Sequence, residues 1–276
     1  MPELPEVETI VKGLQKTVVG KKIKDVNVIF PGIVKQDSKN FKKNVDKTEI
    51  IRVRRRGKYI LIDLSNKKTI LTHLGMTGSL LLLEPSAPLD KHDHLILRFQ
   101  QTEKELRYRD LRKFGKIKSF STPKEENISD LKKLGPESLN IYSSDFVTLF
   151  KKRKGRIKSA LLNQQILAGL GNIYADESLF EAKIHPQQKA DKLSPQKLKK
   201  LHQAIQKILK KAIKAGGSSI ENYYNVDGEI GSFQLQHKVY GREGLPCKKC
   251  RSKIKRIKIS QRSSYFCPRC QKQTRT

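Results

Sequence analysis

The sequence predicts an α+β fold: an N-terminal helix with a β-sandwich, then a helical domain that ends in a four-cysteine finger. Between residues 22 and 121, short apolar runs with β character alternate with turn residues, as in an antiparallel sandwich or barrel. After Thr122-Pro123 this pattern stops and apolar residues recur at helical spacing. All four cysteines lie close to the end of the chain, which sets the last segment apart.

The individual elements follow from periodicity and from their stop signals. Residues 5–19 have the spacing of an amphipathic helix, and Gly20 is a natural end for it. Strands are predicted over residues 23–30, 50–53, 59–64, 69–74, 79–83, 94–99, 105–108 and 116–120. Helices are predicted over residues 143–152, 157–167, 172–182 and 195–215. The last helix has Ser194 as N-cap and Gly216-Gly217 as its end, and its lysine-rich outer face indicates a solvated surface.

Composition restricts the function classes. The 58 Lys and Arg against 27 Asp and Glu give a net charge of +31, which favours a nucleic-acid partner over an anionic membrane or an acidic protein. No stretch approaches the roughly 18 apolar residues of a membrane span. The acidic, proline-containing start is unlike a secretory signal or a basic transit peptide. We therefore expect a soluble protein of the cytoplasm.

The cysteines predict a metal site. Two Cys-x2-Cys pairs, separated by sixteen residues, supply four thiolates in a reducing compartment: Cys247, Cys250, Cys267 and Cys270. Four protein ligands leave no open position for water, so we expect one structural Zn²⁺, and no redox or nucleotide cofactor. Residues 254–266 between the pairs predict a basic β-hairpin with its tip at residues 260–264. Such a finger indicates binding and does not by itself indicate catalysis.

Several short sequence motifs, found in the same order along the whole chain, resemble those of a known family. They are Met1-Pro2-Glu3-Leu4-Pro5-Glu6-Val7-Glu8-Thr9, Arg56-Gly57-Lys58-Tyr59, His73-Leu74-Gly75-Met76, Lys91-His92-Asp93-His94, residues 108–115 (Tyr-Arg-Asp-Leu-Arg-Lys-Phe-Gly), residues 169–177 (Gly-Leu-Gly-Asn-Ile-Tyr-Ala-Asp-Glu), Val239-Tyr240-Gly241-Arg242 and the cysteine finger. Together they resemble the formamidopyrimidine-DNA glycosylases. The related endonuclease VIII branch, which prefers oxidised pyrimidines, differs after Pro2-Glu3.

The resemblance implies a base-excision DNA-repair enzyme that removes oxidised purines, 8-oxoguanine and formamidopyrimidines, and then cleaves the strand by β,δ-elimination. It implies that Pro2 is the nucleophile once Met1 is removed, that Glu3 moves protons, that Lys58 contacts phosphate and assists the elimination, and that Arg262 takes part in the second elimination. A guanidinium holds its proton too tightly to be a good acid, so we interpret Arg262 as a phosphate clamp. From position alone, the reading of Pro2 as a simple helix lead-in is favoured, because proline is common before helices.

The resemblance also implies a set of DNA contacts: His73, Met76, His92, Arg112, Phe114, Arg153, Lys158 and Asn172. Met76, Arg112 and Phe114 would fill the space that a flipped nucleotide leaves and satisfy its partner base. Read without the resemblance, Met76 and Phe114 are core residues. Glu6 is either a second carboxylate of the same pocket or only a first-turn helix charge.

The predicted domains are residues 1–122, the catalytic β-sandwich domain; residues 123–232, a helical DNA-binding domain of the helix–two-turns–helix type with a linker and a lesion-capping loop; and residues 233–276, the zinc finger. The expected partner is damaged double-stranded DNA, bound by a monomer in the cytoplasm and, in a prokaryote, at the nucleoid. The alternatives are an endonuclease VIII-like glycosylase and a non-catalytic zinc protein that binds DNA.

Overall fold

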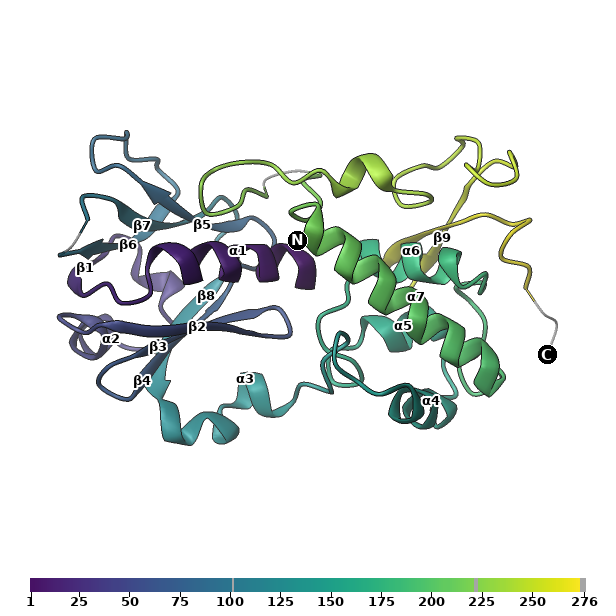
Figure 1. Cartoon of the computed structure of the whole chain (residues 1–276), viewed down its shortest axis with the longest axis horizontal. Helices are drawn as coiled ribbons and strands as arrows, with labels where there is room; N and C mark the ends of the chain where they lie inside the picture. Colours follow the sequence, from purple (N-terminus) through teal and green to yellow (C-terminus); the bar gives the residue numbers. More distant parts are fainter. Residues whose placement is uncertain (101, 221–222, 274–276) are drawn as a thin grey trace. The chain divides into compact units, whose positions relative to one another are not determined.

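The computed structural model describes residues 1–100, 102–220 and 223–273, and the chain divides into two compact units (Figure 1). Unit 1 comprises Met1–Lys132 and Ala215–Gln234, and unit 2 comprises Lys133–Lys214 and Leu235–Thr276. The expected boundaries differ from this division, because they assigned residues 215–232 to the helical domain. Those residues belong to unit 1, where the side chains of Tyr223 and Val226 are buried in its core.

Unit 1 is built on two four-stranded antiparallel sheets, which confirms the predicted sandwich. One sheet has the order β1 (Ile23–Val28), β6 (Asp93–Phe99), β7 (Glu105–Asp110), β5 (Gly78–Leu83). The other has the order β2 (Ile50–Arg56), β3 (Tyr59–Leu64), β4 (Lys68–His73), β8 (Lys116–Ser121). Apolar side chains of both sheets form one buried cluster, which is the core of the unit.

Helix α1 (Leu4–Thr17) lies against strands β2 and β3 of unit 1 (Figure 1). Its buried face carries Val7, Ile10 and Leu14, at the spacing from which the helix was predicted. A capping box formed by Glu3 and Glu6 begins the helix, and proline occupies its first turn. The start of the chain is therefore fixed to the core by both packing and hydrogen bonds.

A second helix of unit 1, α2 (Ser38–Val45), was not predicted. Only Phe41 and Val45 of its eight residues are buried, so its periodic signal is too short to recognise. The Asp37 carboxylate accepts a hydrogen bond from the Asn40 N–H at 2.8 Å and caps it. The described part of the unit also contains the short segments η1 (Pro31–Ile33), η2 (Thr122–Asn127) and α3 (Ser129–Lys132).

Unit 2 contains helices in the four predicted places: α4 (Ser143–Lys151), α5 (Ile157–Leu162), α6 (Asn172–Glu181) and α7 (Pro195–Lys214). Helix α5 ends five residues before the predicted residue 167, because Asn163 has an extended backbone. Helix α7 packs against α4 and α6 through its apolar stripe and exposes most of its lysines. Helix α6 is different, because Ile173–Phe180 are all buried, including two carboxylates. No helix among the described residues is both long and apolar enough to cross a membrane.

The finger of unit 2 is a two-stranded hairpin of β9 (Lys255–Ile259) and β10 (Arg262–Phe266). The connecting residues Ser260 and Gln261 both have positive φ, at 47° and 60°, as in the two-residue turns that match the twist of a hairpin. The predicted hairpin is present, and its turn is shorter than the expected tip. A last short segment, η3 (Phe233–Gln236), lies where the chain passes from unit 1 to unit 2.

Packing at Gly115 yields a test of the core of unit 1. A Cβ atom on residue 115 would lie 1.6 Å from the Tyr108 hydroxyl and 2.9 Å from the His73 carbonyl oxygen. Because neither neighbour can move without disturbing a strand, Gly115→Ala should lower the free energy of unfolding by about 1–3 kcal/mol. Urea denaturation measures this. The matched variant Gly155→Ala, which meets no heavy atom within 4 Å, should unfold at the wild-type midpoint; equal midpoints for both variants would contradict the packing.

Candidate active site and metal centre

The beginning of α1 places Pro2 and Glu3 inside unit 1. Pro2 is buried, the Glu3 side chain is only 2% exposed, and Met1 before them is 41% exposed. The N–H of Glu3 donates to Glu6 Oε2 at 2.8 Å. Removal of Met1 would thus leave the nitrogen of Pro2 next to a buried carboxylate, on a backbone that the helix cap holds in place.

Glu6 has a second partner, which the sequence did not indicate. Its other oxygen, Oε1, accepts a hydrogen bond from the N–H of Ser218 at 2.7 Å. Gly217 has φ +83°, and a Cβ there would lie 2.8 Å from the same oxygen, so the approach requires glycine. The Tyr223 hydroxyl donates to the Glu6 carbonyl oxygen at 3.3 Å. Glu6 lies in the first turn of the helix, and it also joins the helix start to Ser218 and Tyr223.

Lys58 is the second residue of the two-residue turn between β2 and β3, directly before Tyr59, and is 6% exposed. This turn is joined to α1 through Arg55. The Arg55 guanidinium donates to Glu8 Oε2 at 2.7 Å and to the Gly57 carbonyl oxygen at 2.9 Å. Because Glu8 lies in α1, these contacts hold the turn that contains Lys58 against the helix that begins directly after Pro2 and Glu3.

His73 pairs with Tyr59 across strands β4 and β3, with ring centroids 4.8 Å apart. Burial, together with the charges of Lys116 and Lys58, lowers the pKa of His73 to about 4. The ring is therefore neutral at physiological pH. Its Nδ1 accepts from the Gly75 N–H at 3.1 Å, so Nε2 carries the proton. The neutral ring of His73 can therefore donate one hydrogen bond, from Nε2.

Met76, Arg112 and Phe114 are all exposed, in two loops of unit 1. Met76 is 38% and Phe114 59% exposed, so reading these two residues as core is wrong. The Arg112 guanidinium lies 4.7 Å from the centre of the Phe114 ring, a cation–π contact. Large apolar side chains displayed beside a cation are typical of a binding surface.

The buried carboxylate of Asp110 holds these two loops together. Oδ1 accepts from the Thr77 hydroxyl at 2.5 Å, and Oδ2 accepts from the Gly115 N–H at 2.8 Å. The Arg112 N–H lies 3.0 Å from Thr77 Oγ1 and 3.2 Å from Asp110 Oδ1. Sequence reasoning gave Asp110 no role, although it stands inside one of the quoted motifs; an acidic residue at the end of a buried strand was the available signal.

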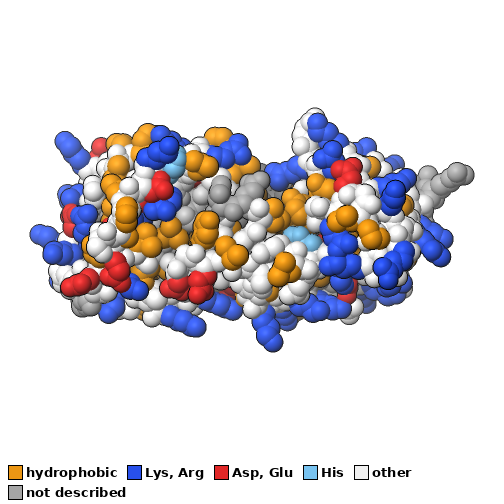
Figure 2. Space-filling view, turned by 90° about the horizontal axis from the view of Figure 1, so that it is seen from above, with side chains coloured by type: hydrophobic (Ala, Val, Ile, Leu, Met, Phe, Trp, Pro, Cys, Tyr) orange, Lys and Arg blue, Asp and Glu red, His pale blue; other side chains and the backbone are white. Residues whose placement is uncertain are grey.

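The two remaining expected contacts outside helices α5 and α6 lie in loops. His92 is half-buried, and its N–H donates to Asp90 Oδ1 at 2.8 Å. Arg153 is exposed in the basic run Lys151-Lys152-Arg153-Lys154, directly after α4. Figure 2 shows Lys and Arg side chains spread widely over one face of the molecule and outnumbering Asp and Glu there. The basic composition is thus displayed at the surface.

Lys158 differs from its expected role. Its side chain is fully buried in unit 2, and Nζ lies 2.7 Å from Oδ1 of Asp176, which is also fully buried. Burial raises the pKa of Asp176, and the charge of Lys158 and the N–H of Tyr265 oppose that shift. Since the ammonium faces the interior of the unit, it is not displayed to a phosphate in this structure. The sequence gave no sign of this, because a lysine at the start of a helix beside a basic run is usually exposed.

Asn172 and Arg262 belong to the same part of unit 2. Asn172, at the first turn of α6, donates through Nδ2 to the Ser263 carbonyl oxygen at 2.9 Å. Arg262 is exposed and directly follows the turn of the hairpin. The structure therefore brings Lys158, Asn172 and the hairpin together, and it leaves the Arg262 guanidinium in solvent.

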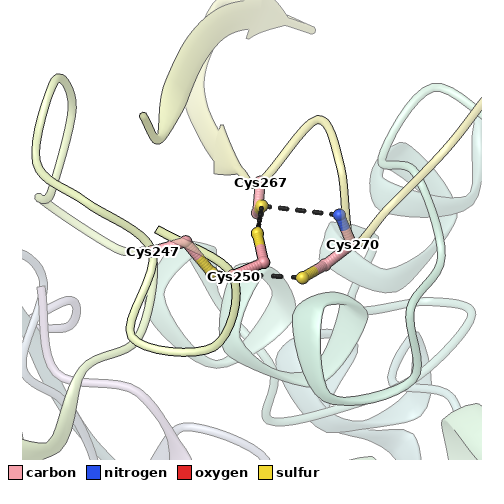
Figure 3. A group of neighbouring side chains, drawn as sticks. All are labelled: Cys247, Cys250, Cys267 and Cys270. Atoms are coloured by element: carbon pink, nitrogen blue, oxygen red, sulfur yellow. Dashed lines mark hydrogen bonds between the residues drawn. The ribbon is translucent and has the colours of Figure 1, made fainter. Parts of the chain in front are cut away.

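The four cysteines at the base of the hairpin converge (Figure 3). Their Sγ atoms all lie within 4.8 Å of one another, with 3.4 Å between Cys250 and Cys267 and 4.0 Å between Cys247 and Cys270. A tetrahedral zinc with Zn–S bonds of about 2.3 Å requires sulfurs about 3.8 Å apart, so the cluster fits this ion. N–H groups of Lys249 and Cys270 point at two of the sulfurs, each at 3.4 Å, as in thiolate sites.

These features define a class: a protein of mixed sheets and helices with a basic four-cysteine finger and with two carboxylates, Glu3 and Glu6, buried beside Pro2 where the first helix begins. Comparison with known proteins makes the class specific. Three family models match: the formamidopyrimidine-DNA glycosylase N-terminal domain over residues 1–117, the H2TH domain of the same family over residues 134–223, and the zinc finger found in FPG and IleRS over residues 244–273. The four cysteines thus form a structural zinc site.

Relatives match over nearly the whole chain. A formamidopyrimidine-DNA glycosylase of Listeria innocua is 43% identical over 275 residues, covering 99% of this chain and all of the relative. The Lactococcus lactis Fpg in complex with DNA containing an abasic site is 39% identical, with a TM-score of 0.93 and coverage of 99% and 100%. The same enzyme with DNA containing N7-benzyl-Fapy-dG gives 39%, a TM-score of 0.92 and the same coverage. The chain belongs to the formamidopyrimidine-DNA glycosylase family.

Removal of one thiolate tests the metal site. Cys247→Ser should reduce bound zinc from one per chain to nearly none, because ordering of the finger depends on the ion. Tryptic cleavage within residues 244–273, which are rich in Lys and Arg, should become faster. Lys248→Ser changes the neighbouring residue, keeps all four sulfurs and should retain the metal. Full zinc content in Cys247→Ser would contradict the site.

Proposed function

We propose that this protein is a base-excision repair glycosylase that removes oxidised purines from duplex DNA and then cleaves the strand. The observation that carries the proposal is the buried Pro2-Glu3 pair at the capped start of α1, in a chain whose full length matches this family. The related Lactococcus enzyme has been crystallised with DNA containing an abasic site and with DNA containing a Fapy-dG derivative. Oxidised purines are the substrate class that this likeness supports.

The chemistry starts at the nitrogen of Pro2 after removal of Met1. An α-amine titrates near 7.7–8.0, so a substantial fraction is an unprotonated nucleophile at neutral pH, whereas most lysines are ammonium ions. The lone pair attacks C1′ of the damaged nucleotide, the bond to the base breaks, and the nitrogen loses its proton as the departing base takes one up. The sugar ring then opens to an iminium ion, with Glu3 delivering a proton to O4′.

Strand cleavage follows from the same iminium ion. It acidifies the C2′ proton; loss of that proton expels the 3′ phosphate. The conjugated product then loses the C4′ proton and expels the 5′ phosphate, and water releases the sugar remnant from Pro2. In this scheme Lys58 contacts phosphate and assists proton transfer in the elimination, and Arg262 holds a phosphate through paired N–H donors. One nucleophile thus accounts for base loss and for both strand breaks.

Binding requires the damaged nucleotide to leave the helix stack, at a cost of a few kcal/mol. We assign Met76 and Phe114 to the vacated space and Arg112 to the unpaired base opposite, since these side chains are exposed on loops that Asp110 holds together. His73, His92, Arg153 and Asn172 are assigned to the DNA backbone. His73 would donate as a neutral group, through Nε2.

We place the protein in the cytoplasm, where in a prokaryote the chromosome lies, acting as a monomer. A single damaged nucleotide has no two-fold symmetry that would call for a dimer. The net charge of +31 supports a DNA partner bound largely through phosphates. Affinity should accordingly fall steeply as salt is raised.

Borohydride trapping tests the proposed function. With DNA containing 8-oxoguanine opposite cytosine, the processed protein should give a covalent complex, and excision should exceed that from a thymine-glycol duplex. A version that carries extra residues before Pro2 should lose trapping and incision by on the order of a hundredfold or more, because its nitrogen is an amide. Pro2→Gly is a weaker control, since a primary amine can also form a Schiff base.

Each outcome separates the alternatives. A protein that binds DNA without a trapped complex would be a non-catalytic zinc protein. Faster release of thymine glycol than of 8-oxoguanine would indicate the pyrimidine-specific branch.

A further inference from the structure

Among the residues that the structure describes, the outer edge of strand β10 is covered by side chains and not by another strand. Residues two apart along a strand direct their backbone groups to the same edge, and in β10 the partner strand β9 occupies only one edge. On the other edge, the Ser263 carbonyl oxygen accepts from Lys158 Nζ at 3.0 Å and from Asn172 Nδ2 at 2.9 Å. The Tyr265 N–H donates to Asp176 Oδ2 at 2.9 Å.

These contacts come from two helices and lie beside Arg262. Lys158 lies in α5, and Asn172 and Asp176 lie one turn apart in α6. The turn of the hairpin is held as well, because the hydroxyls of Ser159 and Ser260 are 2.9 Å apart. Arg262 stands between two anchored residues, Ser260 and Ser263, while its own side chain remains exposed.

The two charged residues of this group contact each other and both contact the backbone of β10. Lys158 and Asp176 are each 0% exposed, and their charged atoms are 2.7 Å apart. A buried ion pair contributes little net stability compared with apolar side chains of similar size, but it enforces one geometry. Asp176 cannot contact a phosphate, since it is acidic and enclosed.

We propose that Lys158 and Asp176 are positioning residues: the buried pair locks the edge of β10 to helices α5 and α6 and thereby sets the place of Arg262. Lys158 then influences the reaction through the hairpin backbone and not as a phosphate contact. The inference rests on the proposed function for its chemical readout. The anchoring of Ser263 and Tyr265 can be tested without reference to that function.

The chemical test is the ratio of products from abasic DNA in a single turnover. That ratio compares strands that have undergone both eliminations with strands that have undergone one, so the fraction of folded enzyme does not alter it. If Arg262 serves the second elimination, Arg262→Ala shifts the ratio toward single elimination. Lys158→Met and Asp176→Asn should each shift it the same way, by about tenfold to a hundredfold, the scale of a misplacement of about 1 Å.

Two further variants keep this test decisive. The double variant Lys158→Met/Asp176→Asn leaves no unpaired buried charge, so it remains available if a single variant fails to fold; it should show the same shift. Lys207→Met removes one positive charge from an exposed pair with Glu181 in the same unit, and should leave the ratio unchanged. A zinc content of one per chain verifies that each variant retains its finger.

The structural test is hydrogen exchange at the hairpin in the protein without DNA. Exchange of the Tyr265 N–H should be slow in the wild type and in Lys207→Met, and at least about tenfold faster in the double variant, because its anchor is weakened. An unchanged product ratio and unchanged exchange would overturn the inference. A shifted ratio in Lys158→Met alone, with Asp176→Asn at the wild-type value, would also overturn it and indicate direct contact of Lys158 with DNA.

Failure of the proposed function gives a different pattern. The wild type would then yield no Schiff base and no strand cleavage, whereas the exchange measurement would still decide whether the pair anchors the hairpin.

Discussion

The candidate active site of unit 1 depends on the hydrogen bonds that the buried carboxylate of Glu6 accepts. One oxygen binds the N–H of Glu3 and the other binds the N–H of Ser218, 212 residues further along the chain. Helix ends ordinarily fray, because their first N–H groups have no partners within the helix. Here the first turn is capped, buried and fastened to a second segment. A nucleophile placed just before such a turn needs little further ordering before it reacts.

Other buried carboxylates of the molecule also bind backbone N–H groups of a second segment. Buried carboxylates accept hydrogen bonds from backbone N–H groups of other segments: Asp110 from the loop that carries Phe114, and Asp176 from strand β10. Glu177 accepts from the N–H groups of Lys238, Val239 and Tyr240, at 2.9–3.0 Å. Hydrogen bonds of this kind are charge-assisted, and they compensate the cost of burying the acid. In a chain of net charge +31, several of the few acids are thus used inside, and most of the bases outside.

Local patterns in the sequence predict the elements, whereas the contacts of these buried acids join residues far apart in the chain and could not be predicted. Strands, long helices and the finger have periodic or spaced patterns, so α7, the sandwich and the four cysteines were all predictable. The exposed DNA-facing candidates Met76 and Phe114 needed the family resemblance, because apolar side chains in isolation indicate a core. Lys158 was misplaced at the surface, since its burial depends on Asp176, eighteen residues away and on another helix. Contacts such as Glu6 with Ser218 leave no local signal at all.

The central claim is that the nitrogen of Pro2 becomes bonded to the sugar of the damaged nucleotide. The most direct measurement is mass spectrometry of the peptides released from the borohydride-reduced complex with DNA. The account predicts that the sugar remnant is found on the peptide that begins at Pro2, attached to its α-nitrogen, with Met1 absent. A remnant on the side chain of Lys58 or of any other lysine would contradict it.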